Sequence, residues 1–146
     1  MKNVKQVIVI RKDLMNPLDK FIGKMIAQGC HGSLGIFLSM MNKNNKLDEV
    51  EPEIKDGKYE LKLTVDVGSD LDNWLRGIYT KVCLYVNSEE ELLNLYNNIK
   101  QTDIPVILIT DNGITKFKGK KTNTCIVIGP YDSDKINKFT GNLKLL

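Results

Sequence analysis

One stretch of the sequence carries polar side chains at a spacing that could bring them together for chemistry. Lys20, Lys24, Gln28 and His31 follow one another at intervals of three or four residues. At about 100° per residue, these positions share one narrow stripe of an α-helix, opposite a stripe of apolar residues. His31 is the protein's only histidine, and an imidazole can exchange protons near neutral pH. Taken alone, a single histidine more often has a structural role.

A second polar group stands at the end of a predicted strand. The run at 105–110 is apolar and rich in β-branched residues, which favours a buried strand, and Asp111, Gly113 and Thr115 follow it. In open α/β sheets, ligands usually bind at the carboxyl ends of strands. The sequence therefore offers two candidate polar clusters, the helix stripe and this turn.

The remaining elements would hold these clusters in place. A strand at 4–10 ends in the charged residues Arg11 and Lys12. Asn87 and Ser88, followed by three glutamates, are typical of a helix start. The order of elements predicts an α/β fold with a mixed sheet, because the short link between the last two strands suits an antiparallel pair. The predicted strands are 4–10, 81–86, 105–110 and 124–128, and the predicted helices are 20–41, 89–100 and 132–139.

An acidic stretch interrupts this pattern between the first helix and the second core strand. Residues 59–67 alternate apolar and polar side chains with the period of a half-exposed strand, and Asp56-Gly57 is a strong turn signal. We therefore predict a β-hairpin or edge strand, inserted at about 48–70 in a single domain that spans residues 1–146.

Composition narrows the class of protein and of partner. The net charge of +3 and the isoelectric point near 8.7 permit an anionic partner, but they fall short of a dedicated nucleic-acid-binding domain. Cys30, Cys83 and Cys125 show no metal-ligand spacing, so we expect small core residues in a reducing compartment. No stretch resembles a signal peptide or a membrane span. We therefore expect a cytoplasmic protein without membrane association.

Several catalytic signatures are absent from the sequence. There is no GxSxG turn for a serine nucleophile, no HExxH for zinc and no GxxxxGK[ST] loop for nucleotide phosphates. The residues alone therefore carry no signature of covalent serine chemistry, zinc-dependent hydrolysis or nucleotide triphosphate binding.

Six groups of residues, spread over both ends of the chain, form a set. They are Lys5-Gln6-Val7-Ile8-Val9, Arg11-Lys12-Asp13-Leu14, Gly23-Lys24 with Ala27-Gln28 and His31, Asp111 with Gly113 and Thr115, Ile128-Gly129-Pro130, and Thr140-Gly141-Asn142-Leu143-Lys144-Leu145. In this order they resemble the archaeal and eukaryotic type of peptidyl-tRNA hydrolase, over roughly residues 4–42 and 74–146. The resemblance implies a three-layer α/β/α fold around a four-stranded mixed sheet. It also implies hydrolysis of the ester between a peptide and the 3′ end of tRNA, with no metal or organic cofactor.

The resemblance assigns roles residue by residue. The family's lysine, glutamine and histidine fall on Lys24, Gln28 and His31, and its aspartate and threonine fall on Asp111 and Thr115. Ester hydrolysis needs an activated water, whose proton Asp111 or His31 could accept. It also needs a donor to the developing oxyanion, which Lys24 or a backbone amide of the turn at Gly113 could supply. Gln28 and Thr115 would orient the water or the substrate, and the choice of base stays open.

Positive side chains near these clusters could bind tRNA phosphates without reading bases. Arg11 and Lys12 are candidates at the end of the first strand, and a basic loop follows Asp111. The resemblance thus implies peptidyl-tRNA as the partner, and it is compatible with a homodimer. The basic loop contributes Lys116, Lys118, Lys120 and Lys121.

Two departures from the family pattern leave alternatives open. Ile114 stands where an arginine is common, and the insertion has no counterpart. They favour, as alternatives, a diverged relative that binds tRNA or a protein without hydrolysis, or a domain whose hairpin docks a partner. If the chain is an enzyme, we expect Gly32 and Gly35 to leave room for the tRNA end along the helix, and Gly29 to let the helix pack closely on the sheet.

Overall fold

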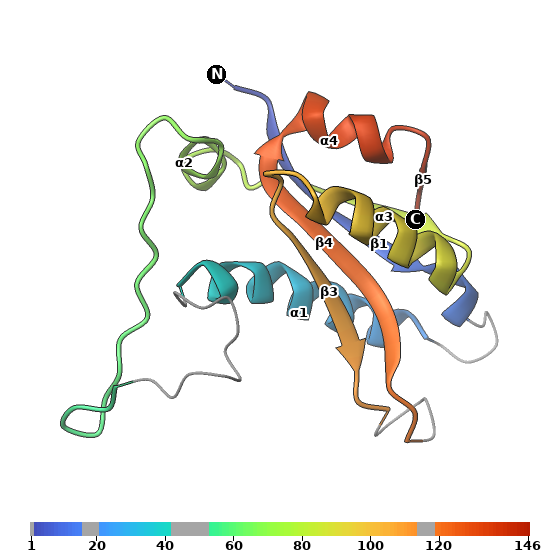
Figure 1. Ribbon diagram of the computed structural model, residues 1–146, viewed down its shortest axis with the longest axis horizontal. Helices are drawn as coiled ribbons and strands as arrows, with labels where there is room; N and C mark the ends of the chain where they lie inside the picture. The colour runs from blue at the N-terminus through green and yellow to red at the C-terminus, as the bar shows by residue number, and fades with distance from the viewer. Residues whose placement is uncertain (1, 16–20, 42–52, 114–118) are drawn as a thin grey trace.

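One mixed β-sheet forms the centre of the chain in the computed structural model, which describes residues 2–15, 21–41, 53–113 and 119–146 (Figure 1). In that part of the chain the strands are β1 (Val4–Arg11), β2 (Lys81–Val86), β3 (Val106–Asp111), β4 (Thr122–Asp132) and β5 (Lys144–Leu145). Their order across the sheet is β3-β4-β1-β2-β5. β1 and β2 run parallel, whereas the other neighbouring pairs are antiparallel.

The predicted α/β class with a mixed sheet is confirmed, but the sheet has five strands and not the expected four. β5 has only two residues, and they pair with Leu84 and Tyr85 of β2. So short a strand has no alternation that a sequence pattern could reveal. β3 and β4 form the antiparallel pair expected from their short link.

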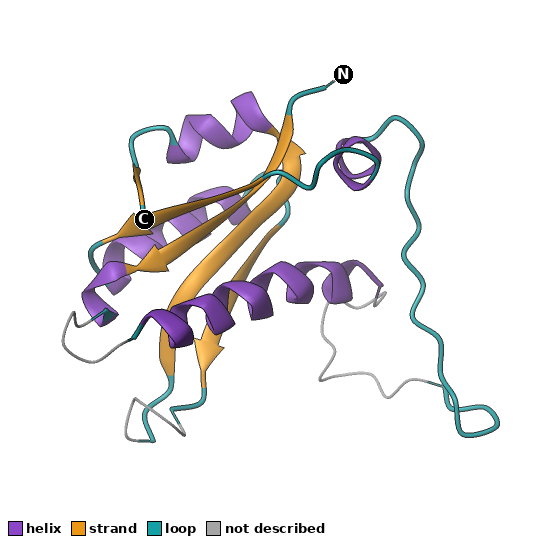
Figure 2. Ribbon diagram, turned by 180° about the vertical axis from the view of Figure 1, so that it is seen from behind, coloured by secondary structure: helices purple, strands orange, loops and turns teal. Residues whose placement is uncertain are grey.

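Helices lie on both faces of this sheet (Figures 1 and 2). They are α1 (Ile22–Met41), α2 (Asp70–Leu75), α3 (Glu89–Lys100) and α4 (Ser133–Thr140), and a 3-10 turn spans Lys12–Leu14. Val7 and Val9 of β1 pack into one apolar cluster with α3 and α4, whereas Ile8 and Ile10 pack with α1. This division follows from the two-residue period of a strand, which sends alternate side chains to opposite faces.

The helix signals in the sequence correspond to real helix ends. The Ser88 hydroxyl accepts from the Glu91 amide at 3.1 Å, and the Glu91 carboxylate accepts from the Asn87 amide at 2.8 Å. This pair of bonds starts α3 in the manner of a capping box, except that Glu91 accepts from the amide of the residue before the N-cap Ser88. Residue 20, at the expected start of the first helix, lies outside the described residues. None of the helices described here has the length and apolar character to cross a membrane.

Two glycines allow α1 to lie close to the sheet. A Cβ atom on Gly32 would collide with a side chain of β4, and one on Gly35 would lie 2.9 Å from Cδ1 of Ile107. At Gly29 the same atom would meet Ile8 at an ordinary 3.5 Å. The expectation for Gly32 and Gly35 is therefore wrong, because they face the sheet and provide close packing there instead of room for a substrate. Gly29 faces the sheet as expected, but a Cβ atom would fit there.

The strand predicted at 59–67 is absent. The Asp56-Gly57 turn forms as expected, with positive φ at both residues, and one isolated bridge closes it. Residues 53–67, which we call the arm, otherwise run extended and away from the sheet (Figure 1). The alternation predicted an extended conformation, but a β-ladder also needs a neighbouring strand, and the described residues provide none.

Two of the three cysteines lie outside the core, contrary to expectation. Cys30 and Cys83 are exposed free thiols, whereas Cys125 is buried and free. Burial raises the pKa of the Cys125 thiol to about 12. Apolar neighbours in sequence did not distinguish these positions, because burial depends on what the helix and the sheet cover.

Candidate active site

A hollow of about 590 Å³ lies between α1 and the edge strand β3. The polar stripe of the helix forms one wall, and the end of β3 forms the other. The two clusters that the sequence analysis singled out therefore meet in space. The lining residues are Lys24, Gln28, His31, Leu108, Ile109, Thr110, Asp111 and Asn112.

Lys24 and Asp111 form the charged centre of this hollow. Lys24 Nζ lies 2.6 Å from Oδ2 of Asp111, and their side chains are only 17% and 11% exposed. Gln28 donates from Nε2 to the same carboxylate oxygen at 3.0 Å. Because little solvent reaches these groups, their electrostatic attraction is stronger than that of an ion pair on an open surface.

The surroundings of Asp111 favour its charged form. Burial raises the pKa of the carboxyl, but hydrogen bonds from Lys24, the Gly113 amide and Gln28 outweigh it, together with the charge of Lys24. The pKa of Asp111 therefore lies below its usual value. The Gly113 amide donates to Oδ1 at 2.8 Å, so both carboxylate oxygens accept hydrogen bonds. Such a carboxylate is a good acceptor and a weak base.

Gly113 gives the turn after β3 a shape that other residues would strain. Its φ is +77°, and a Cβ atom there would collide with the backbone of Lys120. Its carbonyl accepts from the Gly119 amide at 2.8 Å. The turn thereby directs the Gly113 amide at Asp111.

Thr124 of β4 belongs to this arrangement and was missed in the sequence analysis. Its buried hydroxyl donates to Oε1 of Gln28 at 2.9 Å. That bond orients the Gln28 amide, whose Nε2 then faces Asp111. The sequence did contain a signal for this role: Thr124 places a hydroxyl at the start of an otherwise apolar, buried strand. A buried hydroxyl needs a hydrogen-bond partner, so such a residue is a candidate for contact with another polar side chain.

His31 lines the same hollow but differs in its surroundings. It is exposed, and among the described residues no hydrogen bond engages its ring. It lies three residues beyond Gln28, on the same stripe of α1. Its imidazole is therefore available to a bound molecule.

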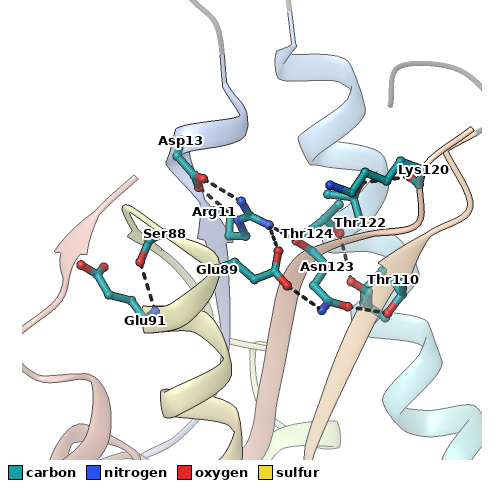
Figure 3. A network of polar contacts seen from close by, with 11 residues as sticks. Arg11, Asp13, Ser88, Glu89, Glu91, Thr110, Lys120, Thr122, Asn123 and Thr124 are labelled. Atoms are coloured by element: carbon teal, nitrogen blue, oxygen red, sulfur yellow. Dashed lines mark hydrogen bonds and ion pairs between the residues drawn. The ribbon is translucent and has the colours of Figure 1, made fainter. Parts of the chain in front are cut away.

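Arg11 and Lys12 do not line the hollow. The Arg11 side chain is 9% exposed, and its guanidinium contacts Asp13 at 2.7 Å, Glu89 at 2.9 Å and the main-chain carbonyl of Asn123 at 3.0 Å (Figure 3). The hydrogen bond with Asp13 is the largest cause of the raised pKa of Arg11. Lys12 is exposed, with its ammonium over an aromatic ring of β2.

The Arg11 network extends to the strand that carries Asp111. Asn123 donates to Glu89 at 3.4 Å and accepts from the Thr110 hydroxyl at 2.7 Å (Figure 3). Thr110 lines the hollow. These contacts join β1, α3, β4 and β3 at the end of the sheet where the hollow lies.

Only part of the predicted basic loop falls within the described residues. Lys120 and Lys121 are exposed and directly precede β4. Thr115, Lys116 and Lys118 lie outside the described residues. Within the described ranges, no group of three or more histidine, cysteine or acidic side chains is placed to hold a metal ion.

The fold and the hollow together define a class of protein. A lysine and a carboxylate paired inside a polar hollow of an α/β domain are typical of an enzyme that acts on a polar substrate. Residues 4–146 match the family described as Peptidyl-tRNA hydrolase PTH2. The chain belongs to this family.

Archaeal relatives match over nearly the whole chain. A peptidyl-tRNA hydrolase of Methanocaldococcus jannaschii is 36% identical over 143 residues, which cover 98% of this chain and 100% of the relative. One of Methanothermobacter thermautotrophicus is 38% identical with the same coverage. One of Nanoarchaeum equitans is 37% identical over 97% of this chain and 98% of the relative. A solved protein of unknown function from Agrobacterium covers 100% of this chain with a TM-score of 0.46 and 13% identity, too low a similarity to support any inference.

Proposed function

We propose that this chain hydrolyses the ester bond between a peptide and the 3′ end of tRNA, which releases the tRNA for reuse. The observation that carries the proposal is the Lys24–Asp111 pair, which Gln28 holds at the wall of a polar hollow. The relatives named peptidyl-tRNA hydrolase and the membership of the family support the same reaction. Water would enter the ester, and the products would be a peptide carboxylate and a tRNA with a free 3′ hydroxyl.

Lys24 would stabilise the charge that develops in the transition state. When water attacks the ester carbonyl, the carbonyl oxygen becomes an oxyanion, and a nearby ammonium lowers its energy. Asp111 holds this ammonium at 2.6 Å, and Gln28 and the Gly113 amide hold Asp111 in turn. The charge is therefore oriented before the substrate arrives, which reduces the cost of reorganisation during the reaction.

We assign the role of base to His31. The other candidate, Asp111, already accepts hydrogen bonds at both oxygens, and its lowered pKa makes it a weak base. His31 lines the hollow and keeps its ring exposed. An imidazole can accept a proton from water near neutral pH and return it to the leaving 3′ oxygen. Thr115, as the family's threonine, would help to orient the attacking water.

The tRNA path would cross the basic loop, with Lys116, Lys118, Lys120 and Lys121 as phosphate contacts. Support comes from the exposure of Lys120 and Lys121 beside the turn at Gly113. Lys12 is exposed and could add another contact. Arg11 would act indirectly in this scheme, because its guanidinium is engaged by Asp13, Glu89 and Asn123.

Three broader features belong to the same proposal. Residues 1–146 would form one domain with a three-layer arrangement, in which α1 covers one face of the sheet and α3 and α4 cover the other. The two apolar clusters on opposite faces of β1 support this arrangement.

The enzyme would work in the cytoplasm, where its substrate arises, and without a metal or organic cofactor.

The test is release of peptide from purified peptidyl-tRNA by the purified protein, in the presence of a chelator. We expect turnover by the unchanged chain and a large loss in Lys24→Ala, His31→Ala and Asp111→Ala. Lys5→Ala is the matched control, because Lys5 lies on β1 and contacts Asn137 of α4, on the other side of the sheet. Binding of tRNA without any release of peptide would contradict the proposal.

A further inference from the structure

The hollow at Lys24 and Asp111 follows the main chain of β3 instead of covering one face of it. Five consecutive residues, 108–112, line the hollow. Successive side chains of a strand point to opposite faces, so a space that touches all five lies beside the edge of the strand. β3 is the outermost strand on its side of the sheet, with β4 as its neighbour (Figure 1). The hollow therefore includes a length of open sheet edge.

The pairing of β3 with β4 shows which main-chain groups point into this space. Just before β3, the Pro105 carbonyl accepts from the Gly129 amide of β4 at 2.7 Å. In an antiparallel pair, residues that bond to the neighbouring strand alternate with residues whose N–H and C=O point away from it. The register shift after Ile109 adds its extra residue to β4, so the alternation along β3 continues. It turns the amides and carbonyls of Leu108 and Thr110 outward, and both residues line the hollow.

The composition of this edge is unusual for one that is open. Residues 106–110 are Val-Ile-Leu-Ile-Thr, without a charge or a proline. Natural proteins usually protect an edge with charged side chains, prolines or a very short strand, because its outward N–H and C=O groups attract further strands. The opposite edge follows that rule, since β5 has only two residues. β3 instead presents a longer, uncharged edge directly beside the ion pair of the hollow.

The position of the ion pair sets the direction of a peptide in the hollow. Under the proposed function, the ester lies at Lys24 and Asp111, and Asp111 is the last residue of β3. The tRNA is attached to the C-terminal carbonyl of the peptide and leaves toward the basic loop beyond the strand. The rest of the peptide extends back past Thr110 and Leu108, along the part of the hollow that these residues line. It therefore runs in the same direction as β3.

We propose that the peptide of the substrate binds as an added parallel strand on the edge of β3, an inference that rests on the proposed function. Strand addition recognises main-chain groups, so it accepts peptides of almost any sequence. In a parallel ladder, alternate residues of the added strand direct their N–H and C=O to the edge. Counted back from the ester, the first and third peptide residues bond to Thr110 and Leu108, whereas the second and fourth point away.

The individual bonds follow from this register. The Thr110 carbonyl accepts from the amide of the first peptide residue, and the Thr110 amide donates to the carbonyl of the third. The Leu108 carbonyl accepts from the amide of the third residue. Because outward positions on a strand are about 7 Å apart, a single amino acid on tRNA cannot reach Leu108. We expect kcat/KM to rise with peptide length up to about three residues and then to level off.

A series of N-acetylated tetrapeptidyl-tRNAs, each with one N-methyl group, tests the alternation. Methylation of the third residue removes the donor to Leu108, and kcat/KM should fall roughly three- to tenfold, as for the loss of one hydrogen bond. Methylation of the second or fourth residue should have little effect, because those amides point away from β3. Equal effects at all three positions would overturn the inference. A failure to release the unmethylated peptide would instead contradict the proposed function.

Thr110→Pro, with Thr110→Ala as its matched control, tests the same ladder from the side of the protein. Both variants lose the hydroxyl, but only proline removes the outward amide, and an edge strand tolerates proline where its N–H points outward. On N-acetyl-tripeptidyl-tRNA, we expect Thr110→Pro to be roughly three- to tenfold slower in kcat/KM than Thr110→Ala.

N-acetyl-aminoacyl-tRNA supplies the control substrate for these two variants. It lacks the third carbonyl, so the two variants should hydrolyse it at the same rate. A loss of folded protein in the proline variant would lower both rates by the same factor, and the ratio between the two substrates corrects for it. An equal ratio of the two variants on both substrates would overturn strand addition at β3.

Discussion

Lys24 and Arg11 are both nearly buried cations paired with carboxylates, yet they serve two regions of different kind. Lys24 is held by Asp111 at the wall of a hollow that can admit another molecule. Arg11 is enclosed by Asp13, Glu89 and a main-chain carbonyl, and it lines no part of that hollow. An ion pair in a protein thus indicates a reactive site only where space lies beside it, and otherwise it braces the fold.

The largest loss of activity is expected when the ammonium of Lys24 is removed, and this loss tests the difference between Lys24 and Arg11. Lys24→Met keeps much of the apolar stem and removes the ammonium, while Asp111 keeps its bonds to Gln28 and Gly113. We expect kcat/KM for peptide release to fall by about 100- to 1000-fold, as for the loss of one oxyanion donor. The midpoint of thermal unfolding should change little. A variant that keeps its activity but loses stability would place Lys24 in the same category as Arg11.

Arg11→Met should show the reverse pattern. The change leaves Asp13, Glu89 and the Asn123 carbonyl without their common donor, so we expect the free energy of unfolding to fall by about 2 kcal/mol. Peptide release per folded molecule should fall far less than in Lys24→Met. Lys138→Met is the control for loss of charge alone, because Lys138 is exposed on α4, away from the hollow. Urea unfolding and the release assay on the same samples distinguish the outcomes.

The pH dependence of the free energy of unfolding tests whether the charged form of Asp111 stabilises the fold. Its pKa in the folded protein is lowered, chiefly because hydrogen bonds from Lys24 and Gly113 outweigh burial. The charged carboxylate therefore stabilises the fold above its unfolded pKa of about 3.9, and this contribution is lost as the pH falls through the lower folded value. The stability advantage of the unchanged protein over Asp111→Asn should shrink across that acidic range in urea titrations. A constant difference would contradict the assignment.

A smaller loss of activity is expected at Thr124, which does not line the hollow but orients Gln28 from β4. Thr124→Val replaces the hydroxyl with a methyl group and leaves Oε1 of Gln28 without its donor, which should cost about 1 kcal/mol of stability. Peptide release should fall several-fold, because Gln28 no longer holds Asp111 in one position. Thr122→Val is the matched control on the same strand, since its hydroxyl donates to the Lys120 carbonyl at the surface. Equal effects in both variants would show that Thr124 only stabilises the strand.

The smallest effect concerns the approach of tRNA to the hollow. Lys120→Ala with Lys121→Ala should lower the salt dependence of tRNA binding, by about 0.9 in slope for each phosphate that the variant no longer neutralises. The rate of release at saturating substrate should stay the same, because neither residue lines the hollow. Filter binding over a range of salt concentrations measures the slope. An unchanged slope would place the tRNA path on another surface.

Sequence patterns predicted the elements well because helices, strands and caps depend on near neighbours. The N-cap at Ser88 and the helix stripe that carries Lys24 and Gln28 could be read from spacing alone. Patterns failed where the outcome depended on distant chain. β5 is two residues long and forms only because it pairs with β2. The arm alternates like a strand, but no strand lies beside it among the described residues. Gly32 and Gly35 could be assigned to the sheet only once α1 was in place.

The amino-acid sequence by itself determined the α/β class, the polar stripe of the first helix and the family resemblance, because these depend on residue types at short spacing. The tertiary structure alone decided that Gln28 meets Asp111, 83 positions away, that Thr124 orients Gln28 from 96 positions away, and that Arg11 is enclosed. These contacts depend on how α1 crosses the sheet and on the register of β3 with β4. Periodicity is a local property of the chain, whereas the meeting of two side chains is a property of packing.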